Sequence, residues 1–251
     1  MQSFSLFIDD IKQLAVELEA VSFQTSDTLL VQVFSSFEQE RVEAACQIIH
    51  ARFPDCTSIG CSAEHFIDRG ELRHQGLLVV FSWFSSTTIS SATVSYSDDL
   101  IRDSDDMLRQ LECHDGTQTA ICFADCLTFD KNNLFYAFDR SALNIPICGG
   151  ASTVTPSGRW VMRNGCCYQG AYVMAALHSE KLVVNRGYFT EWNPIGKTFR
   201  VTAAQGHRLI QLDGVPIREL YNRYLADGLG VPFEQLNNFP LMVGDPKQQN
   251  I

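Results

Sequence analysis

The sequence predicts an α/β (α+β) protein whose mixed, largely antiparallel sheets are packed with outer helices. Segments with helical periodicity alternate with short apolar runs in the first half of the chain, and apolar runs separated by turn residues dominate the second half. With 45% hydrophobic and 11% aromatic residues, the composition is that of a globular protein. A chain of 251 residues is long enough to bury a large core in one domain or in two.

Helices are predicted where apolar residues recur at a spacing of about 3.6 and therefore share one face. The clearest case is the segment 36–54, which Pro54 ends because proline cannot continue a helix. Several aspartates stand at the start of the segment 98–113, where they complement the helix dipole. In chain order the predicted helices are 4–20, 36–54, 98–113, 131–143 and 216–228.

Strands are predicted from short apolar runs bounded by turn residues. In the first part of the chain they are 28–36, 56–62, 76–84, 87–96, 119–127 and 145–152, with 76–84 and 87–96 joined as a hairpin. Three consecutive antiparallel strands are then predicted within 159–165, 166–177 and 181–189, with Asn164-Gly165 as a type I′ turn. Two more strands lie on either side of Gln205-Gly206-His207.

The charge of the chain limits its partners. It has 29 acidic and 19 basic residues, a net charge of -10 and no run of Lys or Arg. Nucleic acid and anionic membrane surfaces are therefore not expected as partners. The apolar runs are far shorter than the roughly 20 residues of a membrane-spanning helix, and the N-terminus lacks the pattern of a signal peptide, so we expect a cytoplasmic location.

The nine cysteines do not indicate a disulfide framework. Their number is odd, most lie in apolar runs and no export signal precedes them, so we expect small buried side chains. The pairs Cys56/Cys61 and Cys122/Cys126 lack the Cys-x-x-Cys spacing and an accompanying His pair. A structural zinc site is therefore disfavoured.

Sequence motifs of common enzymes are missing. The chain has no Gly-x-x-x-x-Gly-Lys-Ser/Thr loop, no Gly-x-Gly-x-x-Gly, no His-Glu-x-x-His and no Gly-x-Ser-x-Gly. We therefore expect a non-catalytic domain. The alternative is a hydrolase with Cys61 or Ser62 as nucleophile and His65 as base. It is disfavoured because a base so close along one loop rarely reaches the nucleophile in the correct geometry.

Two loops at strand ends are candidates for a binding site. Gly60-Cys61-Ser62 follows one predicted strand, and Gly149-Gly150-Ala151-Ser152 follows another. Small residues at such positions let backbone N–H groups approach a ligand closely. The alternative is that these glycines only turn the chain, which is the commoner role of a glycine.

These loops belong to five segments that occur in a fixed order. They are IGCSAEHFI at 59–67, IPICGGAS at 145–152, GAYVMAAL at 170–177, the long stretch 185–225 and FPLMV at 239–243. This order resembles that of the FIST family, intracellular sensory domains of bacterial signal-transduction proteins. The most specific part is the run from Trp192 to Pro216, which resembles the family pattern GW-x-Pro-x-Gly, then V-T-x-A-x-G, then L-D-G-x-P. The resemblance spans nearly the whole chain.

The resemblance implies that the chain binds a small molecule. Amino acids are one ligand class that it implies, and haem that senses nitric oxide is the alternative. It also implies a signalling partner such as a histidine kinase or a cyclic-di-GMP enzyme. In terms of domains, it implies a FIST N-terminal-like sensory domain at 1–190 and the start of a FIST C-terminal-like region at 191–251, which stops where the family would continue.

The predicted ligand pocket combines the two loops with the stretch around Trp192. A carboxylate ligand requires a cation, which Arg186 can supply in a bidentate pair, and Trp192 offers a ring face at a turn. The predicted lining is Cys61, Ser62, Gly149, Gly150, Ser152, Arg186 and Trp192. Haem requires an axial His or Cys, and the candidates are His65 and His207 first, then His178, Cys61 and Cys148.

Overall fold

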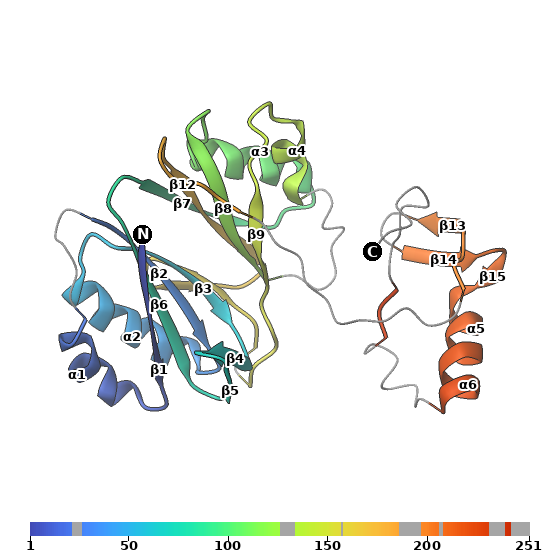
Figure 1. Ribbon diagram of the computed structural model, residues 1–251, viewed down its shortest axis with the longest axis horizontal. Coiled ribbons are helices and arrows are strands. Elements are labelled where there is room, and N and C mark those ends of the chain that lie inside the picture. The colour runs from blue at the N-terminus through green and yellow to red at the C-terminus, as the bar shows by residue number, and fades with distance from the viewer. Residues whose placement is uncertain are drawn as a thin grey trace. The chain divides into compact units, whose positions relative to one another are not determined.

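The computed structural model of the protein describes residues 1–21, 27–125, 134–156, 158–185, 197–205, 208–230 and 239–241. The chain divides into two compact units, Met1–Asn185 and Arg186–Ile251. The described part of the first unit contains two large sheets with helices on their outer faces and a separate two-stranded hairpin. The second unit contains a short antiparallel sheet followed by helical turns (Figure 1). The predicted class of mixed, largely antiparallel sheets with outer helices is confirmed.

The first sheet has six strands in the described part of the chain, in the order β1-β6-β2-β3-β10-β11. In that order their bounds are Gln2–Ile8, Leu77–Phe84, Thr28–Ser35, Thr57–Ser62, Val161–Arg163 and Cys166–Tyr168. Neighbouring strands run antiparallel except β2 and β3, which are parallel. A parallel pair needs a long crossover, and the helix α2 (Gln39–Arg52) supplies it.

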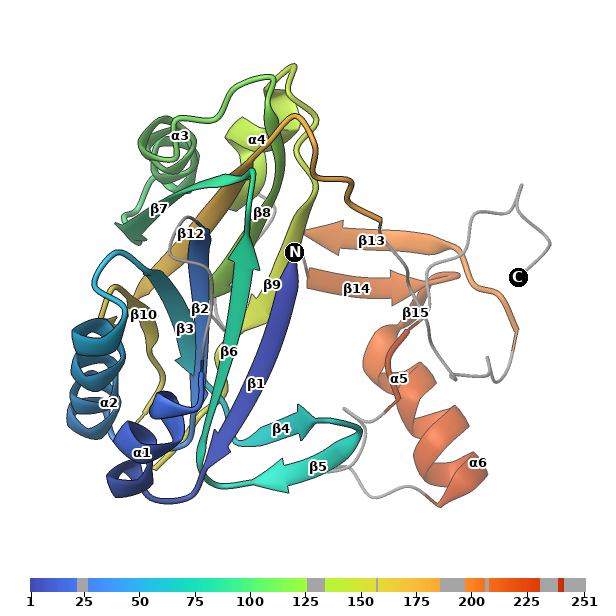
Figure 2. The same ribbon diagram turned by 60° about the vertical axis from the view of Figure 1, so that its left-hand side comes forward.

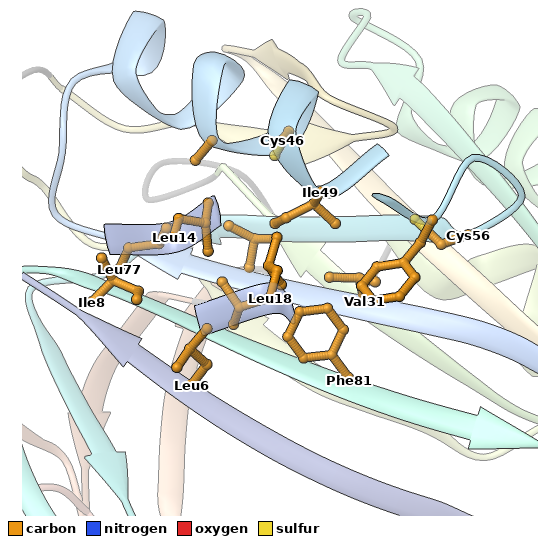
Figure 3. Packing of buried hydrophobic residues seen from close by; sticks show 14 of the residues in the cluster. Leu6, Ile8, Leu14, Leu18, Val31, Cys46, Ile49, Cys56, Leu77 and Phe81 are labelled. Carbon is orange, nitrogen blue, oxygen red and sulfur yellow. The ribbon is translucent and has the colours of Figure 1, made fainter. Parts of the chain in front are cut away.

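The helices α1 (Leu14–Glu19) and α2 cover one face of the first sheet. Alternate residues of each strand turn to this face, because successive side chains of a strand point to opposite sides. Figure 3 shows Val31 and Phe81 of the sheet packed beside Leu18 of α1 and Ile49 of α2. Burial of one such side chain contributes about 1.5–3 kcal/mol, so this layer supplies a large part of the stability of the unit.

The second sheet has the order β7-β12-β8-β9 among the described strands. In that order their bounds are Thr88–Ser95, Ala171–His178, Thr117–Ala124 and Ile147–Ala151. Here β8 and β9 are parallel, and the other neighbours are antiparallel. The helices α3 (Leu100–Gln110) and α4 (Tyr136–Arg140) cover the outer face of this sheet. No helix among the described residues is both long and apolar enough to cross a membrane.

Strand β12 separates two apolar layers, and all eight of its residues are buried. Tyr172 and Met174 pack under α3 and α4, whereas Val173 and Ala175 face the first sheet. The Tyr172 hydroxyl donates a hydrogen bond to the carbonyl oxygen of Asp103 in α3 at 2.8 Å, which satisfies the buried phenol. The first unit therefore consists of four layers, in the order helices, sheet, sheet and helices.

The predicted helix at 4–20 is wrong in its first part. The segment Gln2–Ile8 forms strand β1, which pairs with β6 along its whole length. Leu6 and Ile8 are buried and alternate with less buried neighbours, which is the period of a strand. Helical structure begins only after Asp10, whose carboxylate accepts a hydrogen bond from the Lys12 N–H. Pairing with a distant strand outweighs the local helical pattern here.

The predicted hairpin of 76–84 and 87–96 is also wrong. Both strands exist as β6 and β7, but β6 lies in the first sheet and β7 in the second. Burial explains the separation, since each strand fills a different apolar layer.

Three consecutive antiparallel strands were predicted from residue 159 onwards. Of this prediction, only the hairpin turn between the first two strands is correct. Strands β10 and β11 form a hairpin at Asn164 and Gly165, whose φ angles of 48° and 81° fit the predicted type I′ turn. The chain then crosses to the second sheet as β12, because its apolar residues are buried on both faces. Residues 182–185 are not a strand, and residues 186–189 lie outside the described residues.

One hairpin was not predicted from the sequence. It is formed by β4 (His65–Asp68) and β5 (Glu71–His74), which are joined at Arg69-Gly70. Figure 2 shows it beside the lower ends of β1 and β6. Phe66 anchors it there, with its ring centroid 5.8 Å from that of Phe7 in β1.

The second unit begins, in the described residues, with a three-stranded antiparallel sheet. Its strands are β13 (Val201–Gln205), β14 (Arg208–Leu212) and β15 (Val215–Pro216), and a helical run follows through α5 (Ile217–Tyr221), a π-helical turn (Asn222–Ala226) and α6 (Asp227–Leu229). This confirms the predicted strands around 205–207 and the helix at 216–228. Asp213 joins β14 to β15, and its carboxylate accepts a hydrogen bond from the Arg200 N–H at 3.0 Å, which lowers the pKa of Asp213.

The β10–β11 turn gives a first test of the fold. Gly165→Ala places a side chain on a residue with φ of 81°, and the left-handed conformation should reduce the free energy of unfolding by about 1–2 kcal/mol. Gly150→Ala is the matched control, because its added Cβ meets nothing within 4 Å and its backbone is not left-handed. Urea unfolding of both variants checks this. Equal loss of stability in the two would contradict the turn assignment.

Candidate functional site

A cavity of about 460 Å³ opens between the two sheets of the first unit. Its walls come from β2 and β3 of the first sheet and from β8 and β9 of the second. The volume lies in the range of pockets that hold small organic molecules. The Gly-Cys-Ser end of β3 and the Gly-Gly segment of β9, which lie about ninety residues apart in the chain, therefore meet at one cavity.

The cavity wall is mostly apolar. Phe34 of β2 and Phe123 of β8 contact each other edge to face, with ring centroids 5.2 Å apart, and Ile121 adds to the same wall. Among the described lining residues there is no Lys, Arg, Asp or Glu. This part of the cavity can therefore offer a small molecule only packing and uncharged hydrogen bonds.

Ser62 lines the cavity, but its polar atoms are used within the fold. Its hydroxyl donates to the carbonyl oxygen of Thr153 at 2.7 Å and accepts from the Trp160 N–H at 3.2 Å. Its main chain bonds to the same two residues. Ser62 thus joins the end of β3 to the segments after β9 and before β10, which is a structural role.

Cys61 also lines the cavity, and its side chain is part of the apolar layer between the sheets. Burial raises the pKa of its thiol to about 12. A protonated thiol is a weak nucleophile and a poor metal ligand. Together with the engaged hydroxyl of Ser62, this protonation argues against the hydrolase alternative.

The glycines of the two loops serve strand packing as well as the cavity. A Cβ on Gly60 would lie 2.0 Å from the Val33 carbonyl oxygen, and one on Gly149 would lie 1.8 Å from that of Cys122. These two residues are glycine because the neighbouring strand is too close for a side chain. Gly149 and Gly150 both line the cavity, and Gly150 differs because the position of its Cβ is open.

Ser152 does not line the cavity, although Ala151 and Thr153 on either side of it do. Its side chain is buried, and its hydroxyl lies 3.5 Å from a carboxylate oxygen of Asp125. Its N–H continues the β8–β9 pairing by donating to Ala124.

Three of the predicted site residues, Arg186, Trp192 and His207, lie outside the described residues. His65 is described and is absent from the cavity lining. It belongs to the β4–β5 hairpin, where its ring contacts that of His74 at a centroid distance of 4.7 Å. As a consequence, the structure does not bring His65 together with Cys61 and Ser62 at the cavity.

Gln32 of β2 was missed from the sequence, although it lines the cavity. Its neighbours Val31 and Val33 face the helices, so Gln32 turns to the layer between the sheets, as Leu30 does. The signal was available, because a glutamine in the apolar run TLLVQVF occupies an inward position. It could be recognised only once both faces of the strand were known to be buried.

A second, smaller cavity of about 290 Å³ lies near the end of β12, beside His178 and His114. The Nδ1 atom of His178 lies 2.8 Å from the Thr117 hydroxyl, and Nε2 lies 2.8 Å from the Ser90 hydroxyl. Ser90 also donates to the carbonyl oxygen of Leu111, so Nε2 carries the proton and Nδ1 accepts. This network fits a neutral imidazole with both nitrogen atoms engaged.

The described candidates do not form a convincing haem site. His65 lies off the cavity, both nitrogen atoms of His178 are engaged, and the Cys61 thiol is protonated. Cys148 is the remaining described candidate, an exposed thiol at the cavity edge. No three His, Cys, Asp or Glu side chains are grouped to hold a metal ion within the described ranges.

Residues 29–215 match the family model of the FIST N domain. The match includes both strand-end loops, the whole cavity lining and the Asp213-Gly214 turn. No curated protein matches the sequence significantly.

The structural role of Ser62 is testable. Ser62→Ala leaves the buried Trp160 N–H without its side-chain acceptor and should lower the free energy of unfolding by about 1–3 kcal/mol. Ser152→Ala is the control, since Ser152 is also buried but makes only a 3.5 Å contact, and it should lose less than about 1 kcal/mol. Urea unfolding measures both. A Ser62→Ala variant as stable as the control would refute the role.

The His178 network predicts a pH dependence of stability. Burial, and then the nearby His114, lower the pKa of His178 below its ordinary value of 6.5, while Glu112 opposes them. The folded state therefore favours neutral His178. The contribution of neutral His178 to the free energy of unfolding is complete above pH 6.5. It is lost as the pH falls through the lower pKa that His178 has in the folded state.

Unfolding free energies measured between pH 7 and pH 5 should therefore fall less steeply in His178→Gln than in the wild type. The unfolding free energy of His178→Gln should still depend somewhat on pH, because burial also lowers the pKa of His50. Replacement of the exposed His74 by Gln serves as the control. Parallel pH curves for the wild type and His178→Gln would contradict the prediction.

Proposed function

Because the chain belongs to the FIST N domain family, a family of sensory domains in signal transduction, we propose that it binds a small molecule in the cavity between β2, β3, β8 and β9 and relays the occupancy of this cavity to a signalling protein. The observation that carries the proposal is the convergence of the two strand-end loops on one cavity of about 460 Å³. Nucleophilic catalysis at this site is disfavoured by the protonated Cys61 thiol and the engaged Ser62 hydroxyl.

The position of the cavity suits a role in signalling. It is lined by strands of both sheets, so a bound molecule contacts both. A ligand that contacts two layers stabilises the arrangement in which both contacts are made and shifts the conformational equilibrium towards it. The proposed reader of this shift is a partner such as a histidine kinase or a cyclic-di-GMP enzyme.

Amino acids are the first ligand class to test. Their carboxylate requires a cation, and the described cavity wall offers none. The sequence predicts Arg186 for this role, and Arg186 lies outside the described residues. The haem alternative would require Cys148 or His207 as the axial ligand, and no feature of the described cavity favours it over a small organic ligand.

Thermal unfolding with each of the twenty amino acids tests the proposal. At least one should raise the melting temperature, because a ligand that binds only the folded state stabilises it. Gly150→Phe should abolish the shift by filling the open position at the cavity, whereas Gly150→Ala should retain it. Arg186→Ala should weaken the effect, and the Lys197→Ala control should not. An unchanged shift in Gly150→Phe would place the binding site elsewhere.

A further inference from the structure

Gln32 is one of the polar side chains that line the cavity, with Ser62 and Thr153. It stands on the face of β2 that carries Leu30 and Phe34, and this face packs against the apolar side chains of β8 and β12. Most of its surface is covered. Among the described residues, its carboxamide makes no hydrogen bond to the protein.

The carboxamide of Gln32 is open to the cavity, because its atoms are not among the buried polar atoms that lack a hydrogen-bond partner. A molecule that fills the cavity covers this group and removes its water. A primary amide has two donor hydrogens and an acceptor oxygen, and burying such a group without partners is unfavourable. A ligand of the cavity should therefore carry a polar group that pairs with Gln32.

The edge strand β9, which lines the opposite wall, has main-chain groups that do not pair with β8. The Ala120 N–H donates to Pro146 at 3.0 Å, and the Ser152 N–H donates to Ala124 at 2.9 Å, so even-numbered residues of β9 turn to β8. Alternate residues of a strand turn their polar groups to opposite sides. The N–H and C=O of Gly149 therefore point to the open edge of this strand, and the four residues from Cys148 to Ala151 are exposed.

We infer that Gln32 is the polar recognition residue of the cavity and that the ligand inserts an uncharged amide-type group, with a donor beside an acceptor, ahead of an apolar body. The inference rests on the proposed ligand-binding function. An amide satisfies a carboxamide reciprocally, with N–H donating to C=O in both directions. A carboxylate offers only acceptors and would be desolvated beside Phe34 and Phe123 without a described counter-charge.

The test uses three probes with the full chain. They are 3-phenylpropanamide, 3-phenylpropanoate, which has the same shape but a carboxylate, and toluene, which has no polar group. Calorimetry should show that the wild type binds the amide about tenfold or more tightly than the carboxylate. Gln32→Met should lose about tenfold in affinity for the amide and keep its affinity for toluene.

Two measurements keep the test independent of misfolding. The side-chain NH₂ signal of Gln32 in a ¹H–¹⁵N spectrum, assigned by its absence in Gln32→Met, should move when the amide is added. The urea midpoint of Gln32→Met should equal or exceed that of the wild type, since no side-chain hydrogen bond to a described residue is lost. A lower midpoint would reveal a structural role for Gln32 and overturn the inference.

The outcomes separate the inference from the function on which it rests. If Gly150→Phe blocks the amide but Gln32→Met binds it normally, or if the carboxylate binds as tightly as the amide, the inference fails and the cavity remains a binding site. If no probe binds the wild type while an amino acid still raises its melting temperature and Gly150→Phe abolishes that shift, the inference fails and the proposed function stands. If neither the probes nor the amino acids bind, or Gly150→Phe leaves their binding unchanged, the proposed function of the cavity fails and the inference fails with it.

Discussion

The fold depends on one constraint, the burial of β12 on both faces. Its neighbours β7 and β8 hold it by main-chain hydrogen bonds, so its side chains fill the layer under α3 and α4 and the layer between the sheets. The residues that it turns to the first sheet include Ala171, Val173 and Ala175. Such small side chains suit packed sheets, which lie about 10 Å apart. Every polar group in this layer consequently needs a partner.

The cavity lies where this layer is left unfilled. Strand β9 is at the edge of the second sheet and contributes Gly149 and Gly150, whereas β12 contributes Ala and Val. Without side chains on these glycines, space opens opposite Phe34 and Cys61. Close contact with β8 excludes a side chain at Gly149, but no such contact does so at Gly150. Strand pairing thus explains Gly149, whereas the absence of a side chain at Gly150 leaves space in the cavity.

The local sequence pattern predicted most helices and strands, but it did not predict which strands pair with each other. The helix at 36–54 and the turn at Asn164-Gly165 depend on nearby residues, and the sequence was sufficient for both. The helix predicted at 4–20 was wrong in its first part because β1 pairs with β6, about seventy to eighty residues away. At the site, sequence reasoning found the loops that meet at the cavity. It missed Gln32, because the burial of both faces of β2 is a property of the assembled layers.

The polar residues of the cavity differ in whether their side chains form hydrogen bonds within the protein. The Ser62 hydroxyl is engaged with Thr153 and Trp160, so its place at the cavity is explained by the fold alone. Gln32 makes no such contact in the described chain, and its carboxamide stays open to the cavity. Gln32 belongs to the first sheet and Gly149 to the second. Under the proposed function, a ligand bonded to Gln32 and packed against the second sheet would add a directional hydrogen bond to a layer otherwise filled mainly by apolar contacts, and a directional bond fixes the position of a ligand more strictly than apolar packing does. A signalling partner would then read this structural consequence of an occupied cavity.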